Sequence, residues 1–552
     1  MILAALLTLG LQASAMEHRW VYVMTNLQVA KNADMVCDLI TKAKKSGYNG
    51  FVLADSKFQR LGDVPDFYFT NARKVIDLAK ANQIELIPAV WPVGYASAML
   101  GHDVNLIEGL PVRDARFVAK GGDARPETGE SNLLPTGNFE AVAGDKVVGA
   151  SFQDGIGQST VVDRSEKHDV GQSLRLENFK AGNDAGNARI VWTLEVKPFH
   201  QYVVSGWTKR ENVKGLIQII ALDSKNRNLI INEIAQDSTA PWTPFKYSFN
   251  SLDSSSIRIY AGVWGGTTGR MWWDDISVRD AGLLNVIRRQ GAPLTIKGPD
   301  GAALTEGKDF APIKDPGLGI TPWPGEYDVE HSQPSIKILP GGRIKEGDVL
   351  SVSFYHAKTG IGNQTSICLS EPKTNDLLAD EAKRVYSLFQ PKGLFWSHDE
   401  VRIGGWCHAC QSRKLTPGQI FAEHVRTCAS IQQRLAPKSE VYVWSDMFDP
   451  YHNAVDGYYL TNGTLAGAWE GLPKSAIIVN WNFGQRTKSL PFFANRGHRQ
   501  ILAGYYDGPI GDIKTWIDEA RKTKSLSGVM YTTWVGNYSG LEEFARVAWG
   551  GK

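Results

Sequence analysis

The stretch GLFWSHDE, residues 393–400, joins a short apolar run to two adjacent acidic residues, Asp399 and Glu400. Its first half is typical of a buried strand, and an amphipathic pattern typical of a helix follows at 417–435. A buried strand that ends in two charges is costly unless those charges are used. The stretch therefore predicts a strand–loop–helix unit with candidate functional residues in its loop.

Similar units lie on both sides of this stretch. Strand-like runs precede it at 20–26, 50–55 and 85–91, with helix-like stretches at 33–46 and 70–82. Further strand-like runs follow at 440–444, 476–481, 501–506 and 528–534, with a helix-like stretch at 513–524. Counting the strands gives eight, which predicts an α/β fold, a (β/α)8 TIM barrel interrupted after its third strand.

The interruption is rich in Gly, Ser, Thr and Asn, and its strands are short and alternating. Strands are expected at 173–176, 202–206, 257–259 and 270–278, which is typical of a β-sandwich or jelly roll. A second small β segment is expected to include 293–296, 342–344 and 349–356. The predicted division is a first barrel part at 16–130, the sandwich at 131–283, a small β domain at 284–362 and a second barrel part at 363–552.

The charge balance and the N-terminus limit the function classes. The 552 residues include 60 Lys and Arg against 58 Asp and Glu, so no strong basic field favours a nucleic acid partner. Residues 1–15 combine an apolar run with Ala13-Ser14-Ala15, which predicts a signal peptide and export to the periplasm or medium. The alternative is a buried N-terminal helix, and no later stretch is apolar enough to predict a transmembrane segment.

The five cysteines are too few for a disulfide scaffold. Cys407-His408-Ala409-Cys410 has the spacing of a metal-binding knuckle, but no second pair stands at zinc spacing. In an exported protein, a local disulfide or free buried thiols are the preferred interpretation of Cys407 and Cys410.

The predicted sandwich resembles the jelly-roll carbohydrate-binding modules of secreted glycosidases. The resemblance rests on Asn132-Leu133-Leu134, Gly137-Asn138-Phe139-Glu140, Gly206-Trp207 and Trp273-Asp274-Asp275-Ile276. It implies a structural calcium ion held by Glu140 and Asp275, whose carboxylates suit a hard cation. The alternative is a packing domain that braces the barrel without binding glycan.

The ends of the predicted barrel strands carry aromatic, amide and carboxylate side chains, and these ends are where barrel enzymes place their sites. Aromatic rings stack on the apolar face of a sugar, and carboxylates and amides bind its hydroxyls. The sequence therefore predicts a sugar pocket, although core packing is the alternative for any single Trp. The candidates are Asn26, Asp55, Trp91, His398, Asp399, Glu400, Trp444, Asp446, Asn480, Trp481, Tyr505, Tyr506, Asp507 and Trp534.

Asp399 and Glu400 are interpreted as a glycosidase pair, in which one acid with a raised pKa protonates the leaving oxygen. Neighbouring strand residues point to opposite faces, so both can reach one sugar only if the backbone turns just past the strand. The alternative is a solvated loop that happens to carry two acids.

Asp399-Glu400-Val401 and Tyr505-Tyr506-Asp507 resemble motifs of the family 20 glycoside hydrolases, the substrate-assisted β-N-acetylhexosaminidases, and their relatives. The resemblance implies that Glu400 is the general acid/base and that Asp399 holds the 2-acetamido group of the substrate. The acetamido oxygen then attacks the anomeric carbon, and water opens the oxazolinium intermediate with retention. No cofactor is expected for catalysis.

The resemblance also implies substrate contacts. Tyr505 would bind the acetamido oxygen and Asp507 a sugar hydroxyl, while Trp444, Trp481 and Trp534 would wall the pocket. His398, Trp91, Asp446 and Asn480 complete the predicted substrate-binding set.

Some family features are missing. The stretch Tyr22–Asn26 offers no match for the Arg that the family carries on its first strand, Gly536 stands where the family has Glu, and Ser397-His398 replaces two glycines. The lost contacts would read the C3, C4 and C6 hydroxyls. Because family 123 relatives take N-acetylgalactosamine, a β-N-acetylgalactosaminidase acting on terminal β-linked residues of a glycan or glycoconjugate is favoured.

Two alternatives remain open. One is a glycosidase that uses two protein carboxylates, Glu400 with Asp446, on sugars without an acetamido group. The other is a non-catalytic glycan-binding protein that works through its sandwich.

Overall fold

The computed structural model describes residues 16–129, 131–232, 234, 237–329 and 331–551, so the predicted signal peptide at 1–15 lies outside it. Eight parallel strands close a barrel, which confirms the predicted ring of strands. In order around the barrel they are β1 (His18–Thr25), β2 (Gly50–Asp55), β3 (Glu85–Val90), β18 (Gly393–Trp396), β20 (Glu440–Trp444), β22 (Ile477–Asn480), β23 (Gln500–Tyr505) and β24 (Leu526–Thr532). The helix pattern of a complete (β/α)8 barrel is confirmed only in part, because the segment between the fifth and sixth barrel strands holds short 3-10 turns, Asp446–Phe448 and Ala468–Gly471, in place of an α-helix.

Helices cover the outside of the barrel, as their amphipathic patterns require. Threonine 416 and Gln419 form a capping box at the start of α6, and Pro417 occupies its first turn, where a missing N–H costs nothing. The helices of this layer are α1 (Ala30–Lys45), α2 (Asp66–Ala81), α4 (Pro372–Phe389), α6 (Pro417–Leu435), α7 (Arg486–Asn495), α8 (Asp512–Lys522) and α9 (Leu541–Trp549), with the short α3 (Ser97–Leu100) and α5 (His408–Gln411) in loops.

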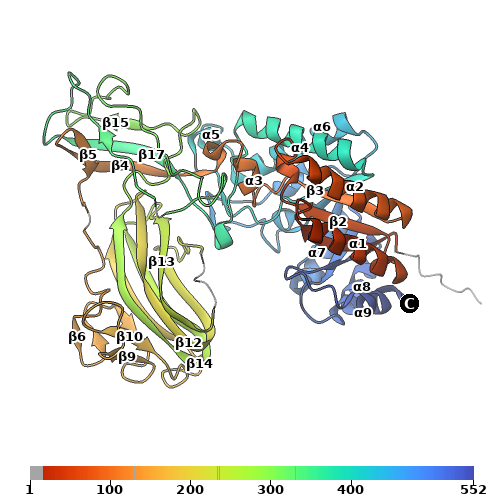
Figure 1. Ribbon diagram of the computed structural model, residues 1–552, viewed down its shortest axis with the longest axis horizontal. Helices are drawn as coiled ribbons and strands as arrows, with labels where there is room; N and C mark the ends of the chain where they lie inside the picture. The colour runs from red at the N-terminus through yellow and green to blue at the C-terminus, as the bar shows by residue number, and fades with distance from the viewer. Residues whose placement is uncertain (1–15, 130, 233, 235–236, 330, 552) are drawn as a thin grey trace, which may run out of the picture.

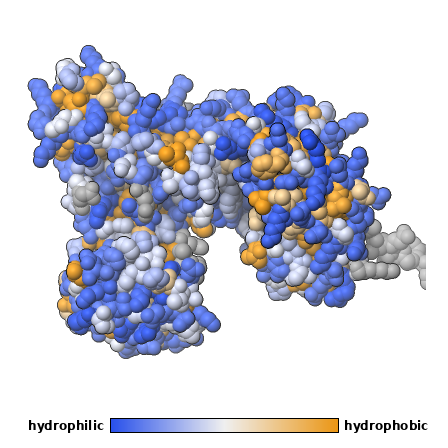
Figure 2. Space-filling view, viewed as in Figure 1, coloured by the Kyte–Doolittle hydropathy of each residue, from blue (hydrophilic) through white to orange (hydrophobic). Residues whose placement is uncertain are grey.

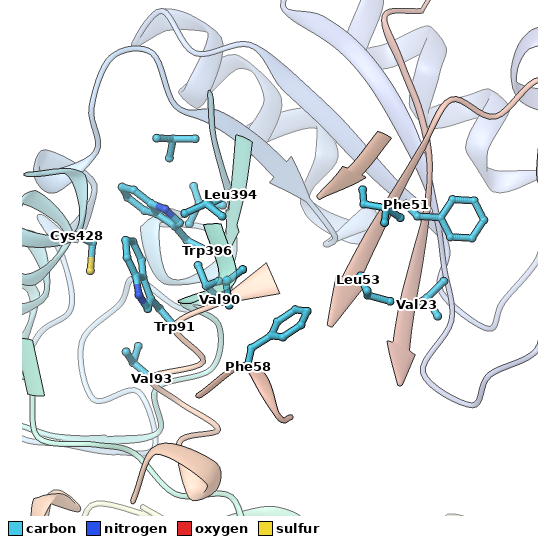
Figure 3. Close-up of a cluster of buried hydrophobic side chains, with 14 of the residues drawn as sticks. Val23, Phe51, Leu53, Phe58, Val90, Trp91, Val93, Leu394, Trp396 and Cys428 are labelled. Atoms are coloured by element: carbon cyan, nitrogen blue, oxygen red, sulfur yellow. The ribbon is translucent and has the colours of Figure 1, made fainter. Parts of the chain in front are cut away.

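Strand alternation divides the side chains into an inner and an outer set. Phe395 packs inside the barrel with Tyr22 and Trp444, whereas Leu394 and Trp396 face the helices. Figure 3 shows part of the outer set, including Trp396 on β18. The inner side chains fill the interior of the barrel, and the residues at the carboxyl ends of the strands lie beyond this packed interior, where they can line a cavity.

A separate five-stranded antiparallel sheet has the order β15-β17-β4-β5-β16. Its strands are β4 (Gly109–Lys120), β5 (Asp123–Pro126), β15 (Thr295–Lys297), β16 (Ile336–Lys337) and β17 (Val349–Ala357). The predicted first barrel part at 16–130 therefore extends too far, since β4 pairs with β17 instead of a barrel strand. The strand expected at 342–344 is irregular backbone with a bend.

The region predicted as a sandwich, called the sandwich below, forms a seven-stranded sheet whose main order is β13-β12-β14-β10-β9. Its longest strands are β12 (Gln201–Leu222) and β14 (Ser256–Asp280), so the strands expected at 257–259 and 270–278 are one strand. The first part of β14 pairs with β11 (Ala188–Glu195) and its last part with β10 (Ser173–Leu176). Register shifts between residues 205 and 207 and between residues 211 and 216 of β12 mark irregularities in its pairing with β14.

The remaining strands are short or lie at the edges. They are β8 (Phe152–Gln153), β9 (Thr160–Asp163) and β13 (Ala240–Asn250) in the sandwich, and the pairs β6 (Val142–Ala143) with β7 (Lys146–Val147) and β19 (Ile403–Gly404) with β21 (Leu460–Thr461).

Figure 1 shows the barrel on one side of the molecule, with the five-stranded sheet and the sandwich stacked on the other. On the face in Figure 2, hydrophobic residues form small separate patches in a largely hydrophilic surface. None of the helices in the described part of the chain is long and apolar enough to cross a bilayer.

Candidate active site

A cavity of about 560 Å³ opens at the carboxyl ends of the barrel strands. Residues from the ends of β1, β2 and β20 and from the loops after β3, β18, β22, β23 and β24 line it. They are Tyr22, Met24, Thr25, Ala54, Asp55, Ser56, Gln59, Ala89, Pro92, Tyr95, Ser97, Ala98, Ser397, Asp399, Glu400, Trp444, Trp481, Tyr506 and Trp534.

Asp399 and Glu400 both line this cavity. Alternation from Phe395 inside the barrel through Ser397 brings Asp399 to the same side. Glu400 has a φ of 48°, in the left-handed region that non-glycine residues rarely adopt. This turn is what allows two neighbouring carboxylates to reach one cavity.

Glu400 is held from several directions. Its Oε2 accepts a hydrogen bond from the Tyr95 hydroxyl and lies 2.8 Å from Nη2 of Arg402. Its backbone N–H donates to Oδ2 of Asp446 over 2.9 Å, and its carbonyl accepts from Gln364 Nε2 over 2.7 Å. These contacts fix both the strained backbone and the carboxylate.

Three carboxyl groups crowd this part of the site. Burial raises the pKa of Asp399 well above its ordinary value, and the nearby charges of Asp446 and Glu400 raise it further. Burial likewise raises the pKa of Asp446 to about 6. The site therefore favours retention of a proton among these groups.

The cavity has aromatic walls. The rings of Trp444 and Trp534 lie 6.1 Å apart, and Tyr22 packs against both at 5.4 Å. Trp481 stacks on Tyr506 with centroids 5.5 Å apart and an interplanar angle of 5°. Such rings offer flat faces to the C–H surface of a sugar, and no polar ligand group is needed for that contact.

Three predicted substrate-binding residues lie outside the cavity. His398 packs between β18 and α6 against His424, because alternation that brings Asp399 inward turns His398 outward. Asn480 faces outward for the same reason and donates to Gln500 Oε1. Trp91 has a φ of 60°, donates its Nε1 hydrogen to the Leu378 carbonyl, and lies beside Trp396 in Figure 3.

Three other residues predicted to bind substrate, Tyr505, Asp507 and Asp446, do not line the cavity and instead contact residues near it. Tyr505 stacks on Tyr531 outside the cavity, and Tyr506 lines it instead, because residues 505–507 all have positive φ. Asp507 accepts from the Thr533 hydroxyl and the Trp534 backbone, so it positions a wall residue. Asp446 is fully buried and does not line the cavity.

The sequence interpretation missed Tyr95, Tyr22 and Arg402. Arg402 stands two residues after Glu400, so a charged side chain next to the acidic pair was a usable signal. Nothing local in the sequence around Tyr95 indicates its contact with Glu400, since the two belong to loops after different strands.

The proposed calcium ligands lie on the exposed surface of the sandwich. Glu140 accepts from the Gln172 backbone, and Asp275 lies 2.9 Å from Nδ1 of His168. Neither belongs to the two groups of three or more candidate metal ligands found in the described part of the chain. The calcium ion stays a prediction.

If Asp399 and Glu400 carry out catalysis, Gly94→Ala is expected to lower activity roughly a hundredfold, because the change displaces their backbone. A Cβ at Gly94 would lie 2.3 Å from the Asp399 carbonyl oxygen and 3.0 Å from that of Glu400. The matched control is Gly404→Ala, whose Cβ meets nothing within 4 Å. Equal kcat/KM for the two variants would show that this contact does not set the geometry.

Asp446→Asn is expected to flatten the dependence of unfolding free energy on pH between about 4 and 6. The pKa of Asp446 is about 6 in the folded protein, above the ordinary value, so the folded state binds the proton more tightly. This contribution is complete at low pH and is lost as pH rises through 6. Urea unfolding across this pH range, with the exposed Asp518→Asn as control, measures the difference; identical slopes in wild type and Asp446→Asn would contradict it.

No family model and no curated protein matches the sequence. Among solved structures, the carbohydrate-binding module TmCBM61, solved with β-1,4-galactotriose, is 16% identical with a TM-score of 0.22, covering 27% of this chain and 99% of its own. A family 16 carbohydrate-binding module is 14% identical with a TM-score of 0.20, covering 27% of this chain and 100% of its own. A rhamnosidase from Novosphingobium sp. PP1Y is 12% identical with a TM-score of 0.34, covering 97% of this chain and 59% of its own.

Proposed function

We propose that this protein is a retaining glycoside hydrolase that releases terminal β-linked N-acetylhexosamine, with N-acetylgalactosamine preferred, by substrate-assisted catalysis. The main observation that supports this proposal is that Asp399 and Glu400 line one cavity with aromatic walls at the carboxyl ends of the barrel strands. This is where barrel enzymes collect their catalytic groups.

In the reactive form that this mechanism requires, Asp399 is ionised and Glu400 carries the proton that this group of carboxyls retains. Glu400 donates that proton to the glycosidic oxygen as the bond to the anomeric carbon breaks. The carbonyl oxygen of the substrate acetamido group forms the new bond to that carbon, and Asp399 orients the group and stabilises its positive charge. Glu400 then removes a proton from water, which opens the oxazolinium ring. Two inversions leave the anomeric configuration retained.

The state of Asp446 favours this mechanism over one with two protein carboxylates. Its side chain is fully buried and accepts from the Glu400 backbone, Asn453 Nδ2 and Trp481 Nε1. A nucleophile must reach the anomeric carbon, and a carboxylate enclosed by three donors does not. Asp446 is therefore a positioning residue for Glu400 and Trp481.

A panel of nitrophenyl β-glycosides of N-acetylgalactosamine, N-acetylglucosamine, galactose and glucose tests the proposal. We expect turnover of the acetamido sugars, fastest for N-acetylgalactosamine, with NMR showing the β-anomer as first product. Turnover of galactoside or glucoside at a comparable rate would contradict an acetamido nucleophile, and no turnover of any substrate would favour a glycan-binding protein.

A further inference from the structure

Four buried side chains from three separate segments meet beside the barrel. Glu108 lies just before β4, Cys368 lies between β17 and α4, and Cys407 and Cys410 bracket the start of α5. Each is at most 2% exposed, and one ligand atom of each lies within 4.8 Å of all the others. All three thiols are free.

The distances within this group are those of a tetrahedral site. Sγ of Cys368 lies 3.4 Å from Sγ of Cys407 and 3.8 Å from Sγ of Cys410. Oε2 of Glu108 lies 3.6 Å and 3.5 Å from the same two sulfurs, Cys407 and Cys410. Around tetrahedral zinc, standard bond lengths place sulfur pairs about 3.8 Å apart and sulfur–oxygen pairs about 3.5 Å apart.

The carboxylate of Glu108 is oriented for a metal. Its Oε1 accepts from the backbone N–H groups of Trp406 and Cys407 over 2.7 and 2.9 Å. Its Oε2 faces only the weakly donating thiols, although burying a carboxylate is costly without a cation or strong donors. Hydrogen bonds on the far oxygen that fix the near one are typical of metal sites.

We propose that Glu108, Cys368, Cys407 and Cys410 bind one structural zinc ion. Thiolates select zinc over calcium and magnesium, and four protein ligands leave no open position for catalysis. The buried Arg289 forms an ion pair with Glu371 over 2.8 Å and donates to the Asn105 and Ile107 carbonyls, which places one positive charge next to the negative ligands and offsets part of their surplus charge. The sequence conceals this site because Glu108 and Cys368 lie far from the Cys407–Cys410 pair.

The location gives the ion a mechanical role. Ile107 and Ile367 form a β-bridge, and the Cys368 N–H donates to the Leu106 carbonyl, so the two ends of the inserted β region meet here. Cys407 and Cys410 belong to the same β18–α6 loop as Glu400. The ion would link the two ends of the inserted β region to the loop that carries Asp399 and Glu400.

The test begins with the full chain purified without chelators and analysed by inductively coupled plasma and native mass spectrometry. We expect one zinc per chain that Cys368→Ser loses and Cys37→Ser keeps, since Cys37 is a buried cysteine on α1. If Cys368→Ser does not fold, titration of wild-type thiols with an organomercurial should release one zinc as Cys368, Cys407 and Cys410 react, located by peptide mapping.

Three results would overturn the proposal. A zinc-free chain whose intact mass is lower by two hydrogens would show a disulfide. A chain that takes up no added zinc with all thiols free would show simple packing. Zinc that is lost in Cys428→Ser but kept in Cys368→Ser would belong to the second buried group, His398, His424 and Cys428.

Discussion

Replacing Glu400 with Gln should lower kcat/KM for an N-acetylhexosaminide with an unactivated leaving group by roughly 10²–10⁴-fold. The amide keeps the shape of the side chain beside Tyr95 and Arg402, but its N–H groups are too weakly acidic to transfer a proton to the glycosidic oxygen. Since the proton is needed most by a poor leaving group, the loss should shrink for a dinitrophenyl glycoside. Steady-state kinetics on the two substrates measure this difference.

The matched control for Glu400 is Glu423→Gln, which removes a carboxylate from the surface of α6, where Glu423 pairs with Arg413. It should leave kcat/KM unchanged. Equal loss for good and poor leaving groups in the Glu400 variant would indicate a structural role, and unchanged hydrolysis would mean that Glu400 is not the acid.

Asp399→Asn should lower the rate on acetamido substrates by roughly a hundredfold or more, the usual effect of removing one charge-stabilising contact in a transition state. Asn preserves the size of the side chain but cannot offset the positive charge of the oxazolinium ion. Affinity for a thiazoline inhibitor, which imitates that ion, should fall in parallel. Inhibition constants and kcat/KM for both proteins provide the comparison.

The control for Asp399 is Asp55→Asn, which changes the third carboxyl that lines the cavity besides Asp399 and Glu400. Asp55 accepts from two backbone N–H groups and the Tyr68 hydroxyl, so its replacement should cost stability without a selective loss of thiazoline affinity. A loss below about threefold in the Asp399 variant would be too small for a transition-state contact and would contradict its role.

The barrel could be predicted because each of its strands is a separate apolar run with its own polar end. The predicted bounds 393–396 and 417–435 coincide with β18 and α6. The length of β14 could not be predicted, since Gly265-Gly266-Thr267-Thr268-Gly269 is typical of a turn. Gly265 and Gly269 do have positive φ, and β14 continues through this irregularity because Trp264 and Thr268 on its two sides both pair with β12. The pairing of β4 with β17 spans the whole insertion and leaves no local signal.

The cavity was only partly predictable from the order of its residues. Alternation along β18 and β22 separates Asp399 and Trp481, which face the cavity, from His398 and Asn480, which do not. The positive φ of Glu400 and of residues 505–507 breaks that alternation. Because side chains rarely adopt this conformation, no local pattern announces it, and the exchange of Tyr505 for Tyr506 follows from it.

The neighbouring strands β3 and β18 also set a problem for biosynthesis. Roughly 300 residues separate them, which a ribosome adding about 5–20 residues per second needs on the order of 15–60 s to make. During that interval the nascent chain carries β3 with one side unpaired, a template for aggregation. This edge stays unpaired until β18 emerges, and the ring closes only later, when β24 pairs with β1.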